Sequence, residues 1–517
     1  MATFTTNHYD LIVLGSDISG LVTAALVAGR GRRVLIIPGG PIGGSYRVGK
    51  TDLPVDTAPL VHLRCPAVRR VCDELGLWPQ IRREHKLVSE FVHWILPEQR
   101  LDIRSDAHSW LPECLRAWPQ DPIVEAWDLR TRWMQATESM LDELLASEGA
   151  LTIDGFWARR FLSRMSSQLP TNNLDDLKPL DPEHPLRQMV YTLQPWLQCM
   201  ALNQLGKAAG WRITGLWDQG PFDHTGGMPA LRAQLLQRIR LKSGEIKSSL
   251  RISEILVKRS RAVGIGLLGK RDRYGCENLV IATDPRILLD GLIAPEQFPR
   301  TLANLLHGVR PVAIRYVLHI EAKADCVSAA IGGPMIVVPD LNQSSPRESE
   351  ASTAPPTWQG QGTMYIRVSP GSDENTRIIS ITRIEEVEPE LSGIRKRILD
   401  ELHLRGVFPF MRGHIHWMYS PHDGMGVTDA AGQRIEKEEV EAEGRIEPEY
   451  LYSGPESPTA LGVGMLPHST GIRNLCFASR LTYPGLGLEG EFVAGLAAAG
   501  TVIGRGRGLR TLFPKRF

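Results

Sequence analysis

The chain of 517 residues lacks several features that would assign it directly to a class of protein. Its apolar runs fall short of the roughly 18 residues that cross a membrane, and its first residues, MATFTTNHYD, show no signal-peptide pattern. Its 59 Lys and Arg residues balance 58 Asp and Glu residues, which argues against a nucleic-acid binder held by bulk charge. We therefore expect a cytoplasmic protein with no nucleic-acid partner.

Cysteine is scarce and unpatterned. The seven cysteines include no C-x-x-C pair and no spacing typical of metal ligands. They fit a reducing compartment better than a disulfide scaffold, and no metal site is expected. His414 and His416 share one face of a strand-like run, but two histidines without a third ligand make a weak metal site. Packing or hydrogen bonding within a sheet is the favoured interpretation of this pair.

Glycine, in contrast, is abundant and unevenly distributed. Nine of the 49 glycines lie in residues 15–49, and eight lie in residues 485–508. With 42% hydrophobic and 23% charged residues, the chain can bury a large core. Its length predicts two or three domains, since a domain usually has about 100–200 residues.

The N-terminal glycines lie within a predicted β-α-β unit. Residues 9–14 and 34–37 are apolar runs typical of strands buried on both faces, and residues 21–33 have apolar side chains at helical spacing. Gly15 and Gly20 fall at the first turn. In a dinucleotide-binding G-x-G-x-x-G motif, such glycines let the backbone approach a pyrophosphate at the helix N-terminus.

The motif departs from this pattern at two positions. Asp17 replaces the middle glycine and adds a negative charge beside the expected phosphate. Two unit charges about 4 Å apart interact by ~4 kcal/mol at an effective dielectric constant of ~20. Pro38 stands after the second strand, where an acidic residue would accept hydrogen bonds from the adenosine ribose. The alternative interpretation of Asp17 is a helix N-cap, which is compatible with an empty phosphate site.

Three separated segments share a wider pattern. The first, 11–60, has Gly43 and Gly44 after the second strand. The second has GGMPAL (226–231) before a helix, then the strand-like runs 252–257 (with Leu256), 261–264 and 280–285; the third has NLCFASR (474–480), YPGLGLEG (483–490) and a helix. In order and spacing these segments, roughly half the chain, resemble the flavin amine oxidase and phytoene desaturase superfamily of FAD proteins.

The resemblance implies an α/β fold with an FAD-type Rossmann domain, a parallel sheet flanked by helices, and an interleaved α+β substrate domain. The implied Rossmann segments are 1–85, 210–300 and 455–517, and the substrate segments are 86–209 and 301–454, with a mobile loop at 339–363. In the substrate segments, 88–103, 312–320 and 363–383 are strand-like, and 129–166 and 186–206 are helical. The acidic stretch 436–449 is interpreted as a solvated face.

The resemblance also implies where FAD would lie, in an elongated slot across the Rossmann unit. The Gly-Asp pair that holds the ribityl chain and pyrophosphate in the family reads Ser479-Arg480 here. The arginine that follows the first glycine pair in the family is replaced by Ser45, with Arg47 close by. The implied cofactor-binding residues are Gly15, Ser16, Asp17, Gly20, Pro38, Gly43, Gly44, Ser45, Leu256, Ser479, Arg480, Gly485, Gly487 and Gly490.

Two of the departures have opposite charges. We expect Asp17 and Arg480 to form a salt bridge where the pyrophosphate would lie, because a buried arginine needs a partner. The alternative places Asp17 as a cap and Arg480 in solvent. The departures at Asp17, Pro38, Ser45 and Arg480 act on one ligand, so together they favour weakened or lost FAD binding.

Two functions follow from this pattern. The favoured one is a non-catalytic binding protein or complex subunit that kept the fold, as Rab GDP-dissociation inhibitors do in this superfamily. The alternative is an active FAD-dependent oxidoreductase that oxidises a C–C or C–N bond of a hydrophobic substrate. No catalytic residue is assigned, and the expected partner is a hydrophobic small molecule or a protein. The basic and apolar tail Arg505–Phe517 suits an anionic membrane surface or an acidic partner, or else forms a frayed soluble terminus.

Overall fold

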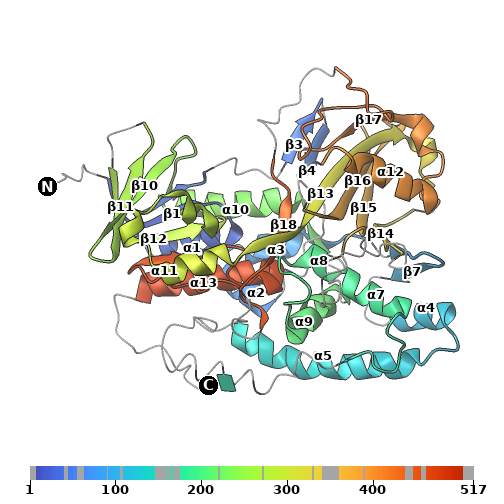
Figure 1. Ribbon diagram of the computed structural model, residues 1–517, viewed down its shortest axis with the longest axis horizontal. Helices are drawn as coiled ribbons and strands as arrows, with labels where there is room; N and C mark the ends of the chain where they lie inside the picture. The colour runs from blue at the N-terminus through green and yellow to red at the C-terminus, as the bar shows by residue number, and fades with distance from the viewer. Residues whose placement is uncertain are drawn as a thin grey trace, which may run out of the picture.

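The protein folds around two large β-sheets, the first at the left of Figure 1 and the second at its upper right. The long helix α5 (Ile123–Leu145) runs below them in this view. This computed structural model describes residues 7–39, 45–49, 51–54, 63, 65–89, 91–104, 109–145, 160, 163–164, 167, 175–218, 220, 222–269, 273–328, 331–340, 360–387, 391–436, 446–455 and 462–504.

The first sheet has seven strands. In order across the sheet they are β10 (Ile252–Lys258), β11 (Arg261–Leu267), β12 (Arg273–Ala282), β1 (His8–Gly15), β2 (Val34–Ile37) and β9 (Glu245–Ile246), with β19 (Leu475–Phe477) beside β12. β1 pairs in parallel with β12 and β2, and β19 pairs in parallel with β12. The carboxyl ends of these strands therefore meet at one edge, where open α/β sheets bind their ligands.

The predicted β-α-β unit is confirmed as β1, α1 (Ile18–Gly29) and β2. Two glycines let α1 lie close to the sheet. A Cβ on Gly20 would lie 2.1 Å from the Cβ of Ala282, and one on Gly15 would lie 2.1 Å from the carbonyl oxygen of Ala282. Both glycines are therefore required by the packing of the chain itself, whether or not a ligand binds nearby.

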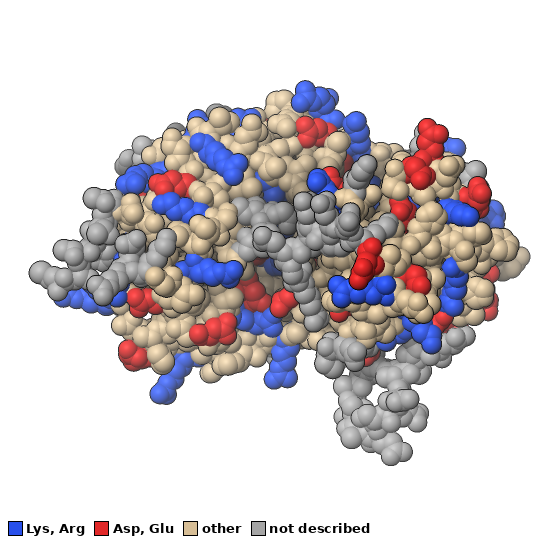
Figure 2. All heavy atoms as spheres, turned by 90° about the horizontal axis from the view of Figure 1, so that it is seen from above, with Lys and Arg blue, Asp and Glu red and all other residues tan. Residues whose placement is uncertain are grey.

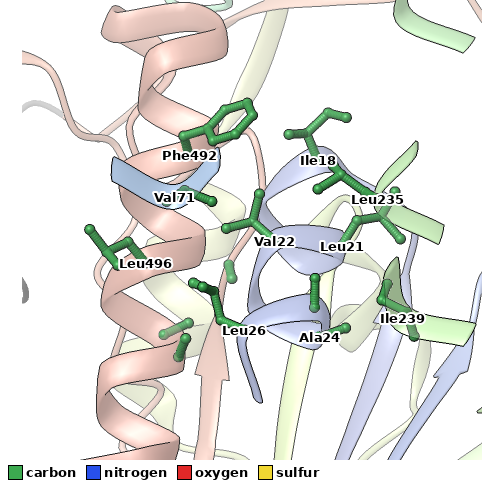
Figure 3. Packing of buried hydrophobic residues seen from close by; sticks show 14 of the residues in the cluster. Ile18, Leu21, Val22, Ala24, Leu26, Val71, Leu235, Ile239, Phe492 and Leu496 are labelled. Carbon is green, nitrogen blue, oxygen red and sulfur yellow. The ribbon is translucent and has the colours of Figure 1, made fainter. Parts of the chain in front are cut away.

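The C-terminal glycine-rich segment forms α13 (Gly487–Gly504), which packs beside α1 in the core. Val22 of α1 lies against Phe492 and Leu496 of α13 in Figure 3. A Cβ on Gly495 would lie 2.6 Å from the carbonyl oxygen of Ser19, so this glycine allows close contact between the helices. The two glycine-rich ends of the chain thus lie side by side.

One described helix has the length and composition of a membrane-crossing segment. It spans Pro484–Gly504 with a mean hydropathy of 1.4, and 61% of that window is buried inside the protein. This burial is typical of a core helix, which agrees with its packing on α1.

The second sheet has eight strands. In order they are β17 (Ile415–Tyr419), β13 (Arg310–Lys323), β16 (Thr376–Glu386), β15 (Met364–Pro370), β14 (Met335–Val337), β6 (Phe91–Ile95) and β7 (Arg100–Arg104), with β18 (Glu449–Ser453) beside β13. The hairpin β3 (Ser45–Val48) and β4 (Thr51–Pro54) packs on this sheet, because Tyr46 and Leu53 share a cluster with Trp417 and Tyr419. β5 (His85–Leu87) pairs with β8 (Phe222–His224).

Helices cover both sheets. Besides α1, α5 and α13, the described α-helices are α2 (Pro66–Glu74), α3 (Trp78–Glu84), α4 (Trp110–Ala117), α7 (Pro185–Thr192), α8 (Gln194–Leu197), α9 (Lys207–Asp218), α10 (Gly227–Leu241), α11 (Arg300–His307) and α12 (Ile394–Leu404). The described 3-10 turns are η1 (Pro285–Asp290), η2 (Pro295–Gln297), η3 (Ala324–Cys326), η4 (Met411–His414) and η6 (Pro484–Leu486).

The strands expected in 88–103, 312–320 and 363–383 are confirmed as β6 and β7, β13, and β15 and β16. The helical interpretation of 186–206 is confirmed for α7 and α8 but is wrong after Leu197, where α8 ends. The backbone of the next residues pairs across the molecule instead: Tyr452 N donates to Cys199 O at 2.8 Å, and Ala201 N donates to Tyr452 O at 2.7 Å. Most of the expected loop 339–363 and the second half of 129–166 lie outside the described residues.

Candidate functional site

A cavity of about 360 Å³ lies beside the N-terminus of α1, at the edge where the parallel strands end. It is lined by residues that follow strands of the first sheet, by residues of β13 and β18 of the second sheet, and by residues of α8, α9, α10 and α13. Its apolar lining residues include Leu197, Ile213, Leu216 and Leu488. Its charged lining residues include Asp17, Arg232, Arg315, Glu449, Arg480 and Glu491.

The expected salt bridge between Asp17 and Arg480 is present. Arg480 Nη2 lies 3.5 Å from Asp17 Oδ1, and the Arg480 backbone N–H donates to Asp17 Oδ2 at 3.2 Å. Asp17 occupies the N-cap position of α1, but its side chain makes no capping hydrogen bond. The pairing interpretation of Asp17 is therefore confirmed over the capping one. The position of the pair relative to a pyrophosphate stays a prediction.

Arg480 has a second and shorter ion pair. Its Nη1 lies 2.7 Å from Glu449 Oε1, and Glu449 Oε2 lies 2.8 Å from Arg315 Nη1. Burial alone would raise the pKa of Glu449, but Arg480 and Arg315 together hold it well below its ordinary value. Burial would likewise lower the pKa of Arg480, and its neighbours Glu449 and Asp17 raise it. The four residues Asp17, Arg480, Glu449 and Arg315 form a row of alternating charges, which we call the ion ladder.

The ion ladder corrects one sequence-based interpretation. Glu449 falls in the acidic stretch 436–449, which was expected to be a solvated face, yet it is only half exposed and pairs with two arginines. Residues 437–445 of that stretch lie outside the described part of the chain.

A second carboxylate reaches the N-terminus of α1. Glu491, near the start of α13, accepts a hydrogen bond from the backbone N–H of Ser19 at 3.3 Å. Burial, and then the charge of Asp17, raise the pKa of Glu491 to about 7, although Arg480 and Arg232 act against this shift. Two carboxylates and one guanidinium thus surround the backbone N–H groups at the N-terminus of α1. At other helix N-termini such N–H groups often bind an anion.

The raised pKa of Glu491 predicts a pH-dependent stability. The folded protein holds the proton more tightly than the unfolded chain, so this contribution is complete below the ordinary pKa of 4.5 and is lost as pH rises through about 7. Glu491→Gln, which mimics the protonated acid, should therefore flatten this dependence by on the order of 1–2 kcal/mol between about pH 5 and about pH 8. Urea unfolding of both proteins at the two pH values measures this.

The exposed Glu386 at the end of β16 offers a matched control. Glu386→Gln should leave the dependence of wild type unchanged. An identical pH dependence in wild type and Glu491→Gln would contradict the assignment of this titration to Glu491.

A buried ion cluster lies beside the cavity. Arg212 of α9 donates from Nε and Nη2 to both oxygens of Glu489 on α13, at 3.0 and 2.9 Å, and its Nη2 lies 2.5 Å from Asp142 of α5. The side chains of Arg212 and Glu489 are 2% and 3% exposed. One guanidinium therefore joins α5 to α9 and α13, two of the helices that line the cavity.

The predicted cofactor-binding residues fall into three groups. Asp17, Arg480 and Gly487 line the cavity. Gly15, Ser16, Gly20, Pro38, Ser479, Gly485 and Gly490 lie in the turns and helices around the same sheet edge, whereas Leu256 lies on β10 and does not line the cavity. Gly43 and Gly44 lie outside the described residues, and for Ser45 only the backbone, at the start of β3, is described.

Three of these residues have identifiable structural roles. Pro38 is buried directly after β2 and offers no side-chain acceptor. The Ser479 hydroxyl accepts from the N–H of Leu481 and so closes its own turn. Gly487 has φ +54°, and a Cβ there would lie 1.8 Å from the carbonyl oxygen of Leu197, so this glycine is required by the fold. Arg47, the neighbour of Ser45, pairs with Asp52 at 2.9 Å.

The other candidate groups show no sign of a catalytic centre. His414 and His416 are both exposed, and no group of three metal-ligating side chains occurs among the described residues. Cys199 lines the cavity, but burial raises the pKa of its thiol, which disfavours the nucleophilic thiolate. None of the seven cysteines, all within the described residues, forms a disulfide bond.

The visible face of the molecule carries mixed charge. In Figure 2, Lys and Arg side chains are interspersed with Asp and Glu side chains, and no extended area of one sign is seen on this face. This distribution agrees with the balanced composition. A continuous basic surface of the kind that binds nucleic acid is not seen in this view.

No model of a known protein family matches the sequence, and no curated protein matches it. Solved structures do. A triple mutant of putrescine oxidase is 13% identical with a TM-score of 0.57, over 96% of this chain and 99% of that one. Cyclohexylamine oxidase from Brevibacterium oxydans is 15% identical with a TM-score of 0.54, over 96% and 99%. An oxidoreductase from Methanosarcina mazei is 12% identical with a TM-score of 0.54, over 95% and 99%. The chain thus has the fold of the flavin amine oxidases, a Rossmann-type α/β domain with a substrate domain, as the sequence motifs predicted.

Proposed function

We propose that this chain uses the amine oxidase fold as a small-molecule binding protein or complex subunit and binds FAD weakly or not at all. The observation that supports this most directly is the presence of two carboxylates, Asp17 and Glu491, at the N-terminus of α1. In dinucleotide-binding folds this terminus receives the pyrophosphate.

The electrostatic argument against a pyrophosphate is strong. The Asp17 carboxylate within about 4 Å of a phosphate would weaken binding by ~4 kcal/mol at an effective dielectric constant of ~20, or nearly a thousandfold. Glu491, whose pKa is raised to about 7, is only partly ionised at neutral pH and adds a smaller repulsion. Arg480 would offset part of this, but its guanidinium already pairs with Glu449 and Asp17. The residues at this helix terminus therefore do not fit a pyrophosphate. In the ion ladder, the charge of Asp17 is instead balanced by Arg480.

The position expected to contact the adenosine ribose also argues against FAD binding. Pro38 follows β2 where a side-chain acceptor would hold the adenosine ribose. The loss of that hydrogen bond adds to the repulsion at the pyrophosphate, since both act on one ligand.

One observation favours the alternative, an active FAD-dependent oxidoreductase on a hydrophobic substrate. The glycine turns of the family motif are retained at Gly15, Gly20, Gly485, Gly487 and Gly490. The close contacts that require Gly15, Gly20 and Gly487 are contacts with the chain itself, however, so their retention follows from the fold.

Flavin content distinguishes the two functions. The full-length protein, produced in cells supplied with riboflavin, should be colourless and should hold well under one FAD per chain after purification. Titration of the purified protein with FAD, followed by flavin fluorescence, should show no saturable binding in the micromolar range. A visible flavin absorbance band with one FAD per chain would establish the oxidoreductase instead.

Association with a membrane stays a separate proposal. The tail Arg505–Phe517 lies outside the described residues, and only its basic and apolar composition supports binding to an anionic surface.

A further inference from the structure

Part of the cavity wall is apolar. Ile213 and Leu216 come from α9, Met228 from α10, and Leu486 and Leu488 from η6 and the start of α13. With a volume of about 360 Å³, the cavity lies in the lower part of the range of roughly 300–1,000 Å³ for ligand pockets. An apolar chain or ring of modest size fits this wall.

Arg232 is the one cavity-lining arginine without an ion partner among the described residues. Arg315 and Arg480 both pair with Glu449, whereas Arg232 makes no ion pair, and its Nε atom is buried without a hydrogen-bond partner in the described part of the chain. A buried guanidinium nitrogen without a partner is unfavourable, so a ligand acceptor at this position would stabilise it.

The guanidinium lies next to the apolar wall. Met228 and Arg232 are four residues apart on α10 and therefore project from the same face of the helix into the cavity. A ligand that contacts Met228 with its apolar part would thus bring a polar group one helical turn away to Arg232.

We propose that the cavity binds an amphipathic monocarboxylate, with its carboxylate on Arg232 and its apolar chain against the wall formed by α9, α10 and α13. A carboxylate matches the planar fork of a guanidinium, with two parallel hydrogen bonds. This inference rests on the proposed function, because it takes the cavity to be free of FAD.

The acidic neighbours of Arg232 restrict the charge of the ligand. Arg232 lies close enough to Glu449 and Glu491 to lower the pKa of both. A phosphate dianion would meet these carboxylates with two charges, whereas a monocarboxylate carries one and is repelled less. A neutral alcohol of the same length would contact the wall but leave the guanidinium with a weaker acceptor.

Calorimetric titration of the full-length protein with decanoate, decanol and decylammonium tests the proposal. Decanoate should bind about tenfold or more tightly than decanol, and decylammonium should bind more weakly than either. Arg232→Met, which keeps the apolar volume, should lower decanoate affinity about tenfold, to the level of decanol, and change decanol affinity less than twofold. Arg240→Met, an exposed arginine on the same helix, is the matched control and should bind decanoate like wild type.

Equal affinity of wild type for decanoate and decanol would overturn the proposal, and this measurement does not depend on any variant. Unchanged decanoate affinity in Arg232→Met, shown by circular dichroism to be folded, would also overturn it. The flavin absorbance of the same preparations separates this failure from that of the proposed function. Colourless protein without selectivity for decanoate removes only the carboxylate site, whereas stoichiometric FAD removes the binding-protein role itself.

Discussion

The double variant Asp17→Gly/Glu491→Ala is expected to bind FAD at least about a hundredfold more tightly than the wild-type chain. It removes both carboxylates from the N-terminus of α1 and leaves Arg480, still paired with Glu449, beside the N–H groups of the helix. The helix N-terminus and one guanidinium would then face a phosphate without an opposing charge. Flavin fluorescence titration of wild type, each single variant and the double variant measures the gain.

The substitutions themselves are mild. Asp17 has φ −55° and ψ 149° and makes no capping hydrogen bond, so glycine at this N-cap position costs only a few tenths of a kcal/mol from the helix. Glu491 lies within α13, where alanine is the best helix former. Thermal unfolding should therefore show that both variants fold. The one expected loss of stability comes from the missing Asp17–Arg480 pair.

A matched pair of isosteres separates charge from volume. Asp17→Asn/Glu491→Gln removes the charges but keeps the side chains, so it should recover part of the affinity if repulsion dominates. A folded glycine–alanine variant with no more FAD affinity than wild type would show that something other than these two carboxylates excludes the cofactor. In that case Pro38 at the ribose end becomes the stronger explanation.

Arg212→Met is expected to lower the free energy of unfolding by about 3–5 kcal/mol. The substitution keeps the apolar stem of the side chain but leaves the Glu489 carboxylate, 3% exposed, without its bidentate partner. An uncompensated buried charge is among the most destabilising single changes in a protein. Urea unfolding of both proteins at neutral pH measures the loss.

A second substitution should reverse most of this effect. In Arg212→Met/Glu489→Leu both buried charges are replaced by apolar groups of similar volume, and such replacements are often neutral or stabilising. Arg412→Met is the control, because its pair with Asp400 is about half exposed and should contribute little to stability. If the double variant were as unstable as Arg212→Met, the loss would come from packing or from Asp142 rather than from the stranded carboxylate.

The sequence predicted the elements whose signals are local. The β-α-β unit and the strands β6, β7 and β13 followed from periodicity and turn residues, whereas the placing of both glycine-rich ends in one domain followed from the resemblance. The Asp17–Arg480 pair was also predicted, because the family motifs place both residues at one ligand. Here a resemblance supplied the long-range information that local patterns lack.

The rest of the site depends on partners that are distant in the sequence. Glu449 pairs with Arg315, 134 residues away, and Arg212 pairs with Glu489, 277 residues away. No periodicity indicates such pairs, and Glu449 was hidden in an acidic stretch that resembles a solvated surface. The helical interpretation of 186–206 fails after Leu197 for the same reason, since the backbone at Cys199 and Ala201 pairs with Tyr452 of β18. Only the fold shows that the Nε atom of Arg232 has no hydrogen-bond partner in the described part of the chain.

The ion ladder also has a mechanical consequence. Asp17 and Arg480 belong to the edge of the first sheet, whereas Glu449 and Arg315 lie on β18 and β13 of the second. Any hinge motion that separates the two sheets beside the cavity must therefore stretch the 2.7 Å contact between Arg480 and Glu449. The same charges that balance the helix terminus act as a latch between the halves of the molecule. A ligand whose entry requires this motion is therefore expected to have a residence time that depends on ionic strength as well as on the fit of its apolar chain.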